Sequence, residues 1–516
     1  MNPKSRTANS MLNISVSVGM QILLLLTSFI SRTVFIRTLG EQYLGISGLY
    51  TNILSLLSLA DLGINTAMIY ALYKPIAQND TDTISELIYY FKKLYLWVAT
   101  VVLALGLLCV PFLQFMVNGS TLPLSKLRLY YILFLGNTVC SYLIVYKATL
   151  ISADQRVFIN RIIDFIAALA LQALQIIILV ITNNYVLYLV SAIGITLLKN
   201  GVLSYISNRI YPFLRQHGQR QIDADIKARL KENIKSIFLY KVSATVMNST
   251  DNILISVILG TVVVGQYSNY LMITMAINTF IMLIAQSVIA SLGNFNAIES
   301  AERKLLILRC MLLFFYFVAT FCSCCFLSMF NDFIDIWVGG INPDYVLSDF
   351  SVFAITFNFF VSCVLNPIWM FRESTGLFNQ VKYSMTFAAI INIGLSVVLG
   401  KLIGLGGIVG ATALSKLMTN FWYEPRVLFR EVFHTSTRKY WLYIARLLGM
   451  SLPCMILCTF VGRALNGSIA YTILKIVISG LITGAMFLVF NRNSEEYVYL
   501  RGIITNTVLR KRSGSV

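Results

Sequence analysis

The stretch that decides the fold runs from residue 252 to residue 298, NILISVILGTVVVGQYSNYLMITMAINTFIMLIAQSVIASLGNFNAI, and it contains no charged residue. Because about 20 apolar residues cross the hydrocarbon core of a bilayer, this run is too long for one span. Gly260 and Gly265 offer a turn between two spans. A second uncharged run, at 165–198, is also too long for one span, and Asn183-Asn184 can form its turn. Both runs therefore predict pairs of transmembrane helices.

The composition of the whole chain points to a membrane protein. Of its 516 residues, 57% are hydrophobic and 12% are charged, and the mean hydropathy is +0.76. Soluble domains carry about 25% charged residues. The net charge of +18 would suggest nucleic-acid binding in a soluble protein. Cytoplasmic loops of membrane proteins collect Lys and Arg, which explains the positive charge without a nucleic-acid partner.

Apolar runs recur along the chain and predict about fourteen transmembrane helices. We expect them near 11–37, 43–73, 94–117, 127–151, 158–182, 185–208, 235–259, 264–292, 306–331, 347–371, 380–400, 404–424, 440–462 and 468–490. The first run, Met11 to Ile30, is long enough to span and lacks a small-residue cleavage site, so we expect an uncleaved first helix.

The distribution of Lys and Arg predicts the orientation. With the N-terminus in the cytoplasm, the inner segments hold 29 of the 40 Lys and Arg residues, the outer segments 6, and the spans 5. The six outer residues are Arg37, Lys126, Arg128, Lys401, Arg463 and Lys475. This asymmetry follows the positive-inside rule and predicts that both termini are cytoplasmic.

The predicted helices group into two lobes. We expect an N-lobe at 1–210 with helices 1–6, a linker at 211–234, a C-lobe at 235–437 with helices 7–12, two further helices within 438–490, and a cytoplasmic tail at 491–516. In the linker, apolar residues recur every four positions, which predicts an amphipathic helix lying on the membrane surface. These residues are Ile222, Ile226, Leu230 and Ile234.

A second amphipathic segment follows the second predicted span. Thr83-x-x-Glu86 resembles a capping box at the start of a helix. Ile84, Leu87, Ile88 and Phe91 then share one face of that helix. Anchoring at the membrane surface is a sufficient explanation for this pattern.

A short internal repeat relates the two lobes. Leu39-Gly40, Gly45 and Tyr50 match Leu259-Gly260, Gly265 and Tyr270 at a constant offset of 220 residues. Both copies start from the same side of the membrane, so the repeat is parallel. The expected fold is an all-α integral membrane protein with two six-helix lobes in parallel pseudo-repeat around a central cavity, followed by two C-terminal helices.

Charged residues inside the spans are the candidate functional residues. Each costs about 2.5–3.5 kcal/mol at a helix centre, so each should face protein or water. Of the five cations in the spans, the candidates are Arg32, Lys199, Lys241 and Lys416, the fifth being Arg446, and the candidate anions are Asp61 and Asp251. The functional interpretation is a central cavity whose cations bind an anionic head group. The alternative is ion pairing within the helix bundle, for example Arg32 with Asp61 or Lys241 with Asp251.

Two further charged residues, Lys147 and Asp164, lie near the inner ends of their spans and are expected to reach the inner surface. The chain shows no pattern typical of catalysis or of a metal site. Its nine cysteines lie in apolar stretches, and its two histidines, His217 and His434, lie in polar segments. We therefore expect neither a metal nor an enzyme.

Several strings resemble one family. Ser31-Arg32-x-x-x-Ile36-Arg37-x-Leu39-Gly40, Tyr43-Leu44-Gly45, Gly48-Leu49 and Leu59-Ala60-Asp61-Leu62-Gly63 resemble the opening of Wzx-type oligosaccharide flippases, members of the multidrug/oligosaccharidyl-lipid/polysaccharide exporter superfamily. Further similar strings are Ser249-Thr250-Asp251-Asn252, Tyr267-Ser268-Asn269-Tyr270, Gly376-Leu377-Phe378, Lys382-Tyr383 and Trp422-Tyr423-x-Pro425. The similarity covers about 10–430.

This resemblance implies a function. The family moves undecaprenyl-diphosphate-linked oligosaccharide repeat units from the inner to the outer leaflet of the bacterial plasma membrane by alternating access, for capsule, exopolysaccharide or related surface polysaccharides. By motif position, a cationic role in the cavity would fall on Arg32 and on Arg37. The resemblance also implies a monomer without a cofactor that works beside a polymerase and other polysaccharide-assembly proteins. Transport would draw on the membrane potential, H⁺ or Na⁺, with Asp61 and Asp251 as candidates for ion coupling.

Two other functions remain open from the residues. A cation-coupled drug antiporter of the same superfamily would be expected to have fewer deep cations and a more acidic binding site. A membrane polysaccharide polymerase or glycosyltransferase would need sizeable outer loops that carry catalytic groups. The deep cations disfavour the antiporter, and the short predicted loops disfavour the enzyme.

Overall fold

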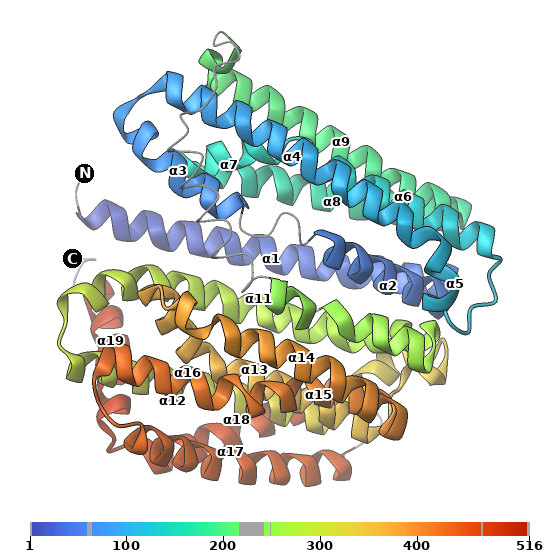
Figure 1. Cartoon of the computed structure of the whole chain (residues 1–516). Helices are drawn as coiled ribbons and strands as arrows, with labels where there is room; N and C mark the ends of the chain where they lie inside the picture. The colour runs from blue at the N-terminus through green and yellow to red at the C-terminus, as the bar shows by residue number, and fades with distance from the viewer. Residues whose placement is uncertain (1–2, 59–63, 216–241, 248, 466–467, 513–516) are drawn as a thin grey trace. The chain divides into compact units, whose positions relative to one another are not determined.

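A computed structural model describes residues 3–58, 64–215, 242–247, 249–465 and 468–512, which are helical with short connections and contain no strand (Figure 1). The labelled helices of the first half are α1 (Pro3–Leu39), α2 (Glu41–Leu57), α3 (Ile64–Gln78), α4 (Thr81–Cys109), α5 (Leu113–Met116), α6 (Leu124–Tyr142), α7 (Val145–Ala153), α8 (Val157–Thr182) and α9 (Tyr185–Ile210). Those of the second half are α11 (Thr261–Ile298), α12 (Ala301–Ile334), α13 (Asp349–Thr375), α14 (Phe378–Ile403), α15 (Leu405–Met418), α16 (Asn420–Leu428), α17 (Arg438–Ala464), α18 (Ile469–Asn491) and α19 (Glu495–Arg512). Short 3-10 or π turns lie at η2 (Val110–Phe112), η3 (Pro212–Arg215), η4 (Asp335–Gly339), η5 (Pro343–Tyr345) and η6 (Phe429–Phe433).

The helix count confirms the expected membrane fold. Eleven described helices, including one at Val242–Leu259, are long and apolar enough to span a bilayer, and α6 with α7, bent by 41°, makes a twelfth. The two remaining predicted spans correspond to α2 with α3 and to α15 with α16. Each of these four helices is shorter than the roughly 20 residues that cross a bilayer. Counting each pair as one broken span brings the total from twelve to the predicted fourteen.

The chain forms two compact units, Met1–Gly265 and Gln266–Val516. The first unit extends past the lobe boundary expected at 211–234. The helix at Val242–Leu259 and the start of α11 bond to the end of α5 and to the loop after it. The Thr261 N–H donates to the Asn118 carbonyl at 2.9 Å, and the Ser256 hydroxyl donates to the Met116 carbonyl at 2.7 Å. The predicted linker helix lies outside the described residues beyond Arg215, and the five-part division of the chain stays a prediction.

The first unit is a bundle in which α8 packs between α1 and α9, α9 packs on α6, and α6 packs on α4. The helix cap at the start of α4 differs from the sequence prediction. Asp80, not Thr83, is the N-cap: its carboxylate accepts hydrogen bonds from the Thr83 N–H at 3.0 Å and from the Thr83 hydroxyl at 2.6 Å. The predicted apolar face, with Ile84, Leu87 and Phe91, is buried within the unit.

The second unit is arranged around α12, which contacts α13, α17, α18 and α19 (Figure 1). The two helices that follow the predicted C-lobe are held to α12 by polar contacts. From α17, the Ser451 hydroxyl accepts a bond from Thr320 at 2.7 Å, and from α18, Thr483 contacts the Cys324 thiol at 3.7 Å. Such contacts hold helices together in lipid, where apolar surfaces alone give little preference between partners. The predicted cytoplasmic tail is largely helical, as α19.

The internal repeat appears in the backbone. Gly40, with a φ of 84°, precedes α2, and Gly260, with a φ of 108°, precedes α11. Glycine adopts these positive φ values without steric cost. Tyr50 and Tyr270, which also match in the repeat, are both fully buried. The hydroxyl of Tyr50 donates to the Leu127 carbonyl at 3.0 Å, and that of Tyr270 donates to Asn331 at 2.6 Å.

Candidate functional site

Arg32, the first predicted site residue, lies half-buried on α1 within the first unit. Its guanidinium is close enough to Tyr188 of α9 for an electrostatic interaction. One turn earlier on α1, Ser28 accepts a hydrogen bond from the Gln172 amide of α8 at 2.8 Å. Arg32 therefore lies on a polar part of α1 that faces α8 and α9.

An aromatic cluster adjoins this part of α1. Tyr185 is central, with the rings of Phe35, Tyr43 and Tyr130 at 5.9, 5.0 and 4.8 Å. The hydroxyl of Tyr185 lies 2.7 Å from that of Ser47 on α2. These edge-to-face contacts join α1, α2, α6 and α9 and hold the helix that carries Arg32 in place. Arg37, at the end of α1, is exposed.

Lys199 of α9 forms an ion pair that the sequence analysis did not anticipate. Its ammonium donates to the Asp164 carboxylate of α8 at 3.2 Å, and the two side chains are 34% and 62% exposed. Lys147, expected near the inner surface, donates to Ser204 at 2.7 Å and to Asn208 at 2.9 Å, both on α9. A charged pair exposed to lipid would be costly, so Lys199 and Asp164 need water or polar groups beside them.

Lys416, the predicted site residue of the second unit, lies on α15. Its ammonium donates to the Ser362 hydroxyl at 2.8 Å and to the Asn358 amide oxygen at 3.4 Å, both on α13. Asp251 is half-buried on the helix at Val242–Leu259. The other two predicted residues, Lys241 and Asp61, lie outside the described residues, and with them the two suggested ion pairs.

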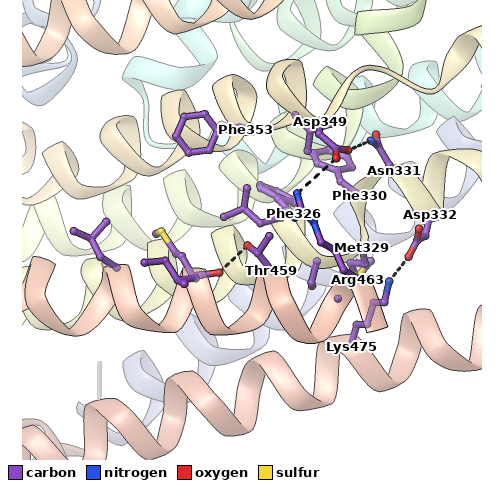
Figure 2. A pocket seen from close by; sticks show the side chains of 17 residues that line it. Phe326, Met329, Phe330, Asn331, Asp332, Asp349, Phe353, Thr459, Arg463 and Lys475 are labelled. Atoms are coloured by element: carbon purple, nitrogen blue, oxygen red, sulfur yellow. Dashed lines mark hydrogen bonds and ion pairs between the residues drawn. The ribbon is translucent and has the colours of Figure 1, made fainter. Parts of the chain in front are cut away.

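A group of charges in the second unit was not predicted from the sequence; it lies where α12, α13, α17 and α18 line a pocket of about 450 Å³. Figure 2 shows four charged side chains gathered at one end of it. Lys475 of α18 pairs with Asp332 of α12, and Arg463 of α17 lies 3.9 Å from Asp349 of α13. The Asn331 amide also donates to Asp349, at 3.2 Å.

Counting Lys475 among the outer cations was wrong. It lies six residues inside α18 and is 1% exposed, so it is a buried cation that needs its carboxylate partner. Its position inside the predicted span 468–490 was the available signal. Its partner Asp332 is 143 residues away in sequence and could not be assigned without the packing of α12 against α18.

A second buried pair joins α13 to α16. Arg372 donates to the Glu424 carboxylate at 2.8 Å, with side-chain exposures of 4% and 8%, and also contacts Glu373 at 3.3 Å. Glu424 occupies the unspecified position of the string Trp422-Tyr423-x-Pro425. The motif therefore marked the correct segment, while the residue that carries its charge was overlooked.

Comparison with solved structures shows which class of protein has this fold. The structure titled "Lipid II flippase MurJ, inward closed conformation" is similar with a TM-score of 0.68 and 13% identity, over 93% of this chain and 99% of that one. A multidrug resistance MATE family transporter of the MOP superfamily, inward-facing, is similar at a TM-score of 0.59 and 14% identity, over 78% and 94% of the two chains. The MATE multidrug transporter DinF-BH in complex with R6G is similar at 0.55 and 17%, over 82% and 96%. The chain thus has the fold of multi-pass flippases and transporters.

The sequence itself places the chain within that class. The family model for polysaccharide biosynthesis proteins matches residues 10–290, which is 281 of 516 residues. The chain belongs to this polysaccharide biosynthesis protein family, which confirms the resemblance drawn from its motifs. No curated protein matches the chain.

Proposed function

We propose that this protein is a flippase that moves undecaprenyl-diphosphate-linked oligosaccharide repeat units from the inner to the outer leaflet of the bacterial plasma membrane by alternating access. The observation that carries the proposal is the combination of two findings: the polysaccharide biosynthesis family match over 10–290 and the similarity to a lipid II flippase over 99% of that chain. The product would enter capsule, exopolysaccharide or a related surface polysaccharide. The termini would be cytoplasmic, in keeping with the distribution of Lys and Arg.

The proposed binding group consists of cations that hold the diphosphate. It comprises Arg32, Arg37, Lys199, Lys241 and Lys416. Arg and Lys donate charge-assisted hydrogen bonds to phosphate oxygens, which are roughly twice as strong as neutral ones. Arg32 and Lys199 stand near other polar groups of the first unit, and the partial exposure of the Lys199–Asp164 pair fits a hydrated surface. Phosphate oxygens would compete with Asp164 for Lys199.

Coupling and partners belong to the same proposal. Asp61 and Asp251 are the candidates for binding H⁺ or Na⁺, and transport also draws on the membrane potential. The protein would act as a monomer that hands its cargo to a polymerase and other polysaccharide-assembly proteins on the outer side. No cofactor takes part in this scheme.

The test is translocation in proteoliposomes. Liposomes would contain undecaprenyl-diphosphate-linked oligosaccharide and the purified protein, and an impermeant glycan-cleaving enzyme added outside would report the cargo that becomes exposed. We expect faster exposure than in protein-free liposomes, and loss of that acceleration in Arg32→Ala. The matched control is Lys401→Ala, an exposed lysine in the last turn of α14 outside the proposed binding group. No acceleration by folded protein would overturn the proposal.

The similarity to MATE transporters supports one alternative, a cation-coupled exporter of small molecules. The same proteoliposomes can be loaded with a fluorescent organic cation and given a H⁺ or Na⁺ gradient. Export of the cation without movement of the lipid-linked oligosaccharide would establish this alternative.

A further inference from the structure

The pocket of the second unit is an elongated groove with apolar walls. Phe326 and Phe330 of α12 and Val352 of α13 line it and are buried, with at most 5% exposure. Phe353 of α13 and Ile456 of α17 also line it but are 53% and 57% exposed. The groove therefore opens sideways between α13 and α17, toward the medium that surrounds the helices. In a bilayer that medium is hydrocarbon, so an alkyl chain is the expected occupant of a groove with apolar walls.

The length of the groove corresponds to one leaflet. Its lining on α17 runs from Leu452 to Arg463, eleven residues apart, which is about 16 Å at 1.5 Å per residue. The hydrocarbon core of a bilayer is about 30 Å thick, so one leaflet contributes about 15 Å. A single acyl chain of an ordinary phospholipid fits this length, whereas a long polyprenyl chain would extend beyond it.

The polar end of the groove lies where a lipid head group would lie. Asp349 is the first residue of α13 and Arg463 is the last but one of α17, so both stand at helix ends (Figure 2). Their side chains are 84% and 70% exposed, and their separation of 3.9 Å makes a weak, replaceable ion pair. Beneath them, the buried Lys475 is matched by Asp332. The end of the groove thus presents one cation and one anion side by side.

We propose that this groove binds one acyl chain of a membrane glycerophospholipid whose head group carries both a phosphate and an ammonium, as in phosphatidylethanolamine. The phosphate accepts hydrogen bonds from Arg463, and the ammonium donates to Asp349, so one weak pair is replaced by two charge-assisted contacts. A head group with negative charge alone would meet Arg463 but would be repelled by Asp349, whereas the charge of Asp332 is matched by Lys475. The site lies within the second unit and is independent of the proposed transport activity.

The experiment measures which lipid the purified, full-length protein retains. Protein in detergent is incubated with vesicles of phosphatidylethanolamine, phosphatidylglycerol and undecaprenyl phosphate in equal amounts, and bound lipids are counted by native mass spectrometry. We expect one phosphatidylethanolamine per protein, preferred by up to about fivefold, the effect expected for one exposed ionic contact. Arg463→Gln should reduce this retention by a similar factor, and Thr459→Trp, which fills the groove, should abolish it.

A variant that gains binding of another lipid distinguishes loss of the proposed site from misfolding of the protein. Asp349→Asn removes the repulsive carboxylate, so it should lower retention of phosphatidylethanolamine and raise that of phosphatidylglycerol, which an unfolded protein would not do. Lys401→Gln, an exposed lysine that does not line the groove, is the matched control and should behave as wild type. Equal retention of the phospholipids, preference for undecaprenyl phosphate, or retention unchanged in all three groove variants would overturn the proposal.

Discussion

Gly45 and Gly265, which occupy matching positions in the internal repeat, contact each other where α2 crosses the start of α11. A Cβ atom added to Gly265 would lie 3.1 Å from the Gly45 nitrogen and 2.4 Å from the Glu41 carbonyl oxygen. A Cβ atom added to Gly45 would lie 1.9 Å from the Thr261 carbonyl oxygen. Small residues at helix crossings let backbones approach closely in membranes. These two glycines of the repeat therefore lie at one close helix crossing within the first unit.

We predict that Gly265→Ala destabilises the protein by about 1–3 kcal/mol, because a methyl group there overlaps backbone atoms that cannot move aside. Thermal unfolding in detergent, followed by circular dichroism, measures the change. Gly201→Ala is the control, since no atom lies within 4 Å of its added Cβ on α9. A melting temperature of Gly265→Ala equal to that of Gly201→Ala would refute the close contact.

Removing one partner of the buried Arg372–Glu424 pair should destabilise the protein more than removing both. Arg372→Met leaves the buried Glu424 carboxylate without this partner and should cost about 3–5 kcal/mol. Glu424→Leu should cost less, because Arg372 keeps its contact with Glu373. The double variant removes both charges and should recover most of that loss. A double-mutant cycle of melting curves gives the coupling, and additive losses would contradict a direct interaction.

Asp80 offers a test of the helix cap and its pH dependence. The Thr83 hydroxyl and then the Thr83 N–H stabilise the carboxylate and lower the pKa of Asp80 below its ordinary value of 3.8. With the folded pKa depressed, this contribution to stability is complete above the unfolded pKa and is lost as pH falls through the folded pKa. Asp80→Ala should cost about 1 kcal/mol at neutral pH.

Asp80→Asn supplies the matched comparison, because Asn also caps helices but does not titrate. Melting temperatures between pH 3 and pH 7 should show a smaller loss on acidification for Asp80→Asn than for wild type. Identical pH profiles for the two proteins would mean that the Asp80 carboxylate does not contribute as described.

The proposed cargo predicts an effect of membrane potential on transport. A diphosphate carries about two negative charges, and each releases about 2.3 kcal/mol per 100 mV when it moves out of an inside-negative compartment. An imposed inside-negative potential should therefore speed exposure of the lipid-linked oligosaccharide in proteoliposomes. Dissipating the potential with an ionophore is the control, and a rate that ignores the potential would exclude this driving force.

Parts of the fold could be predicted from local sequence alone. The fourteen spans and the glycine breaks at Gly40 and Gly260 followed from uncharged runs and a short repeat. The candidate site could be predicted from the sequence only in part. Lys199 and Lys416 were singled out by their depth, but their partners Asp164 and Ser362 were not. The ion pair of Lys475 with Asp332 was missed because each residue was interpreted from its own stretch of sequence, without the packing of α12 against α18.

The sequence by itself determined that this chain is a membrane protein with about fourteen helices and that it resembles polysaccharide flippases, because hydropathy, charge and short motifs are properties of single segments. The tertiary structure decided which charges meet, which spans consist of two shorter helices, and where a groove forms. Those outcomes depend on how each helix is rotated and tilted against its neighbours, and the packing of side chains from distant segments sets both. Arg463 and Asp349 show the difference: only the packing of α13 and α17 against α12 made these two residues the polar end of one groove.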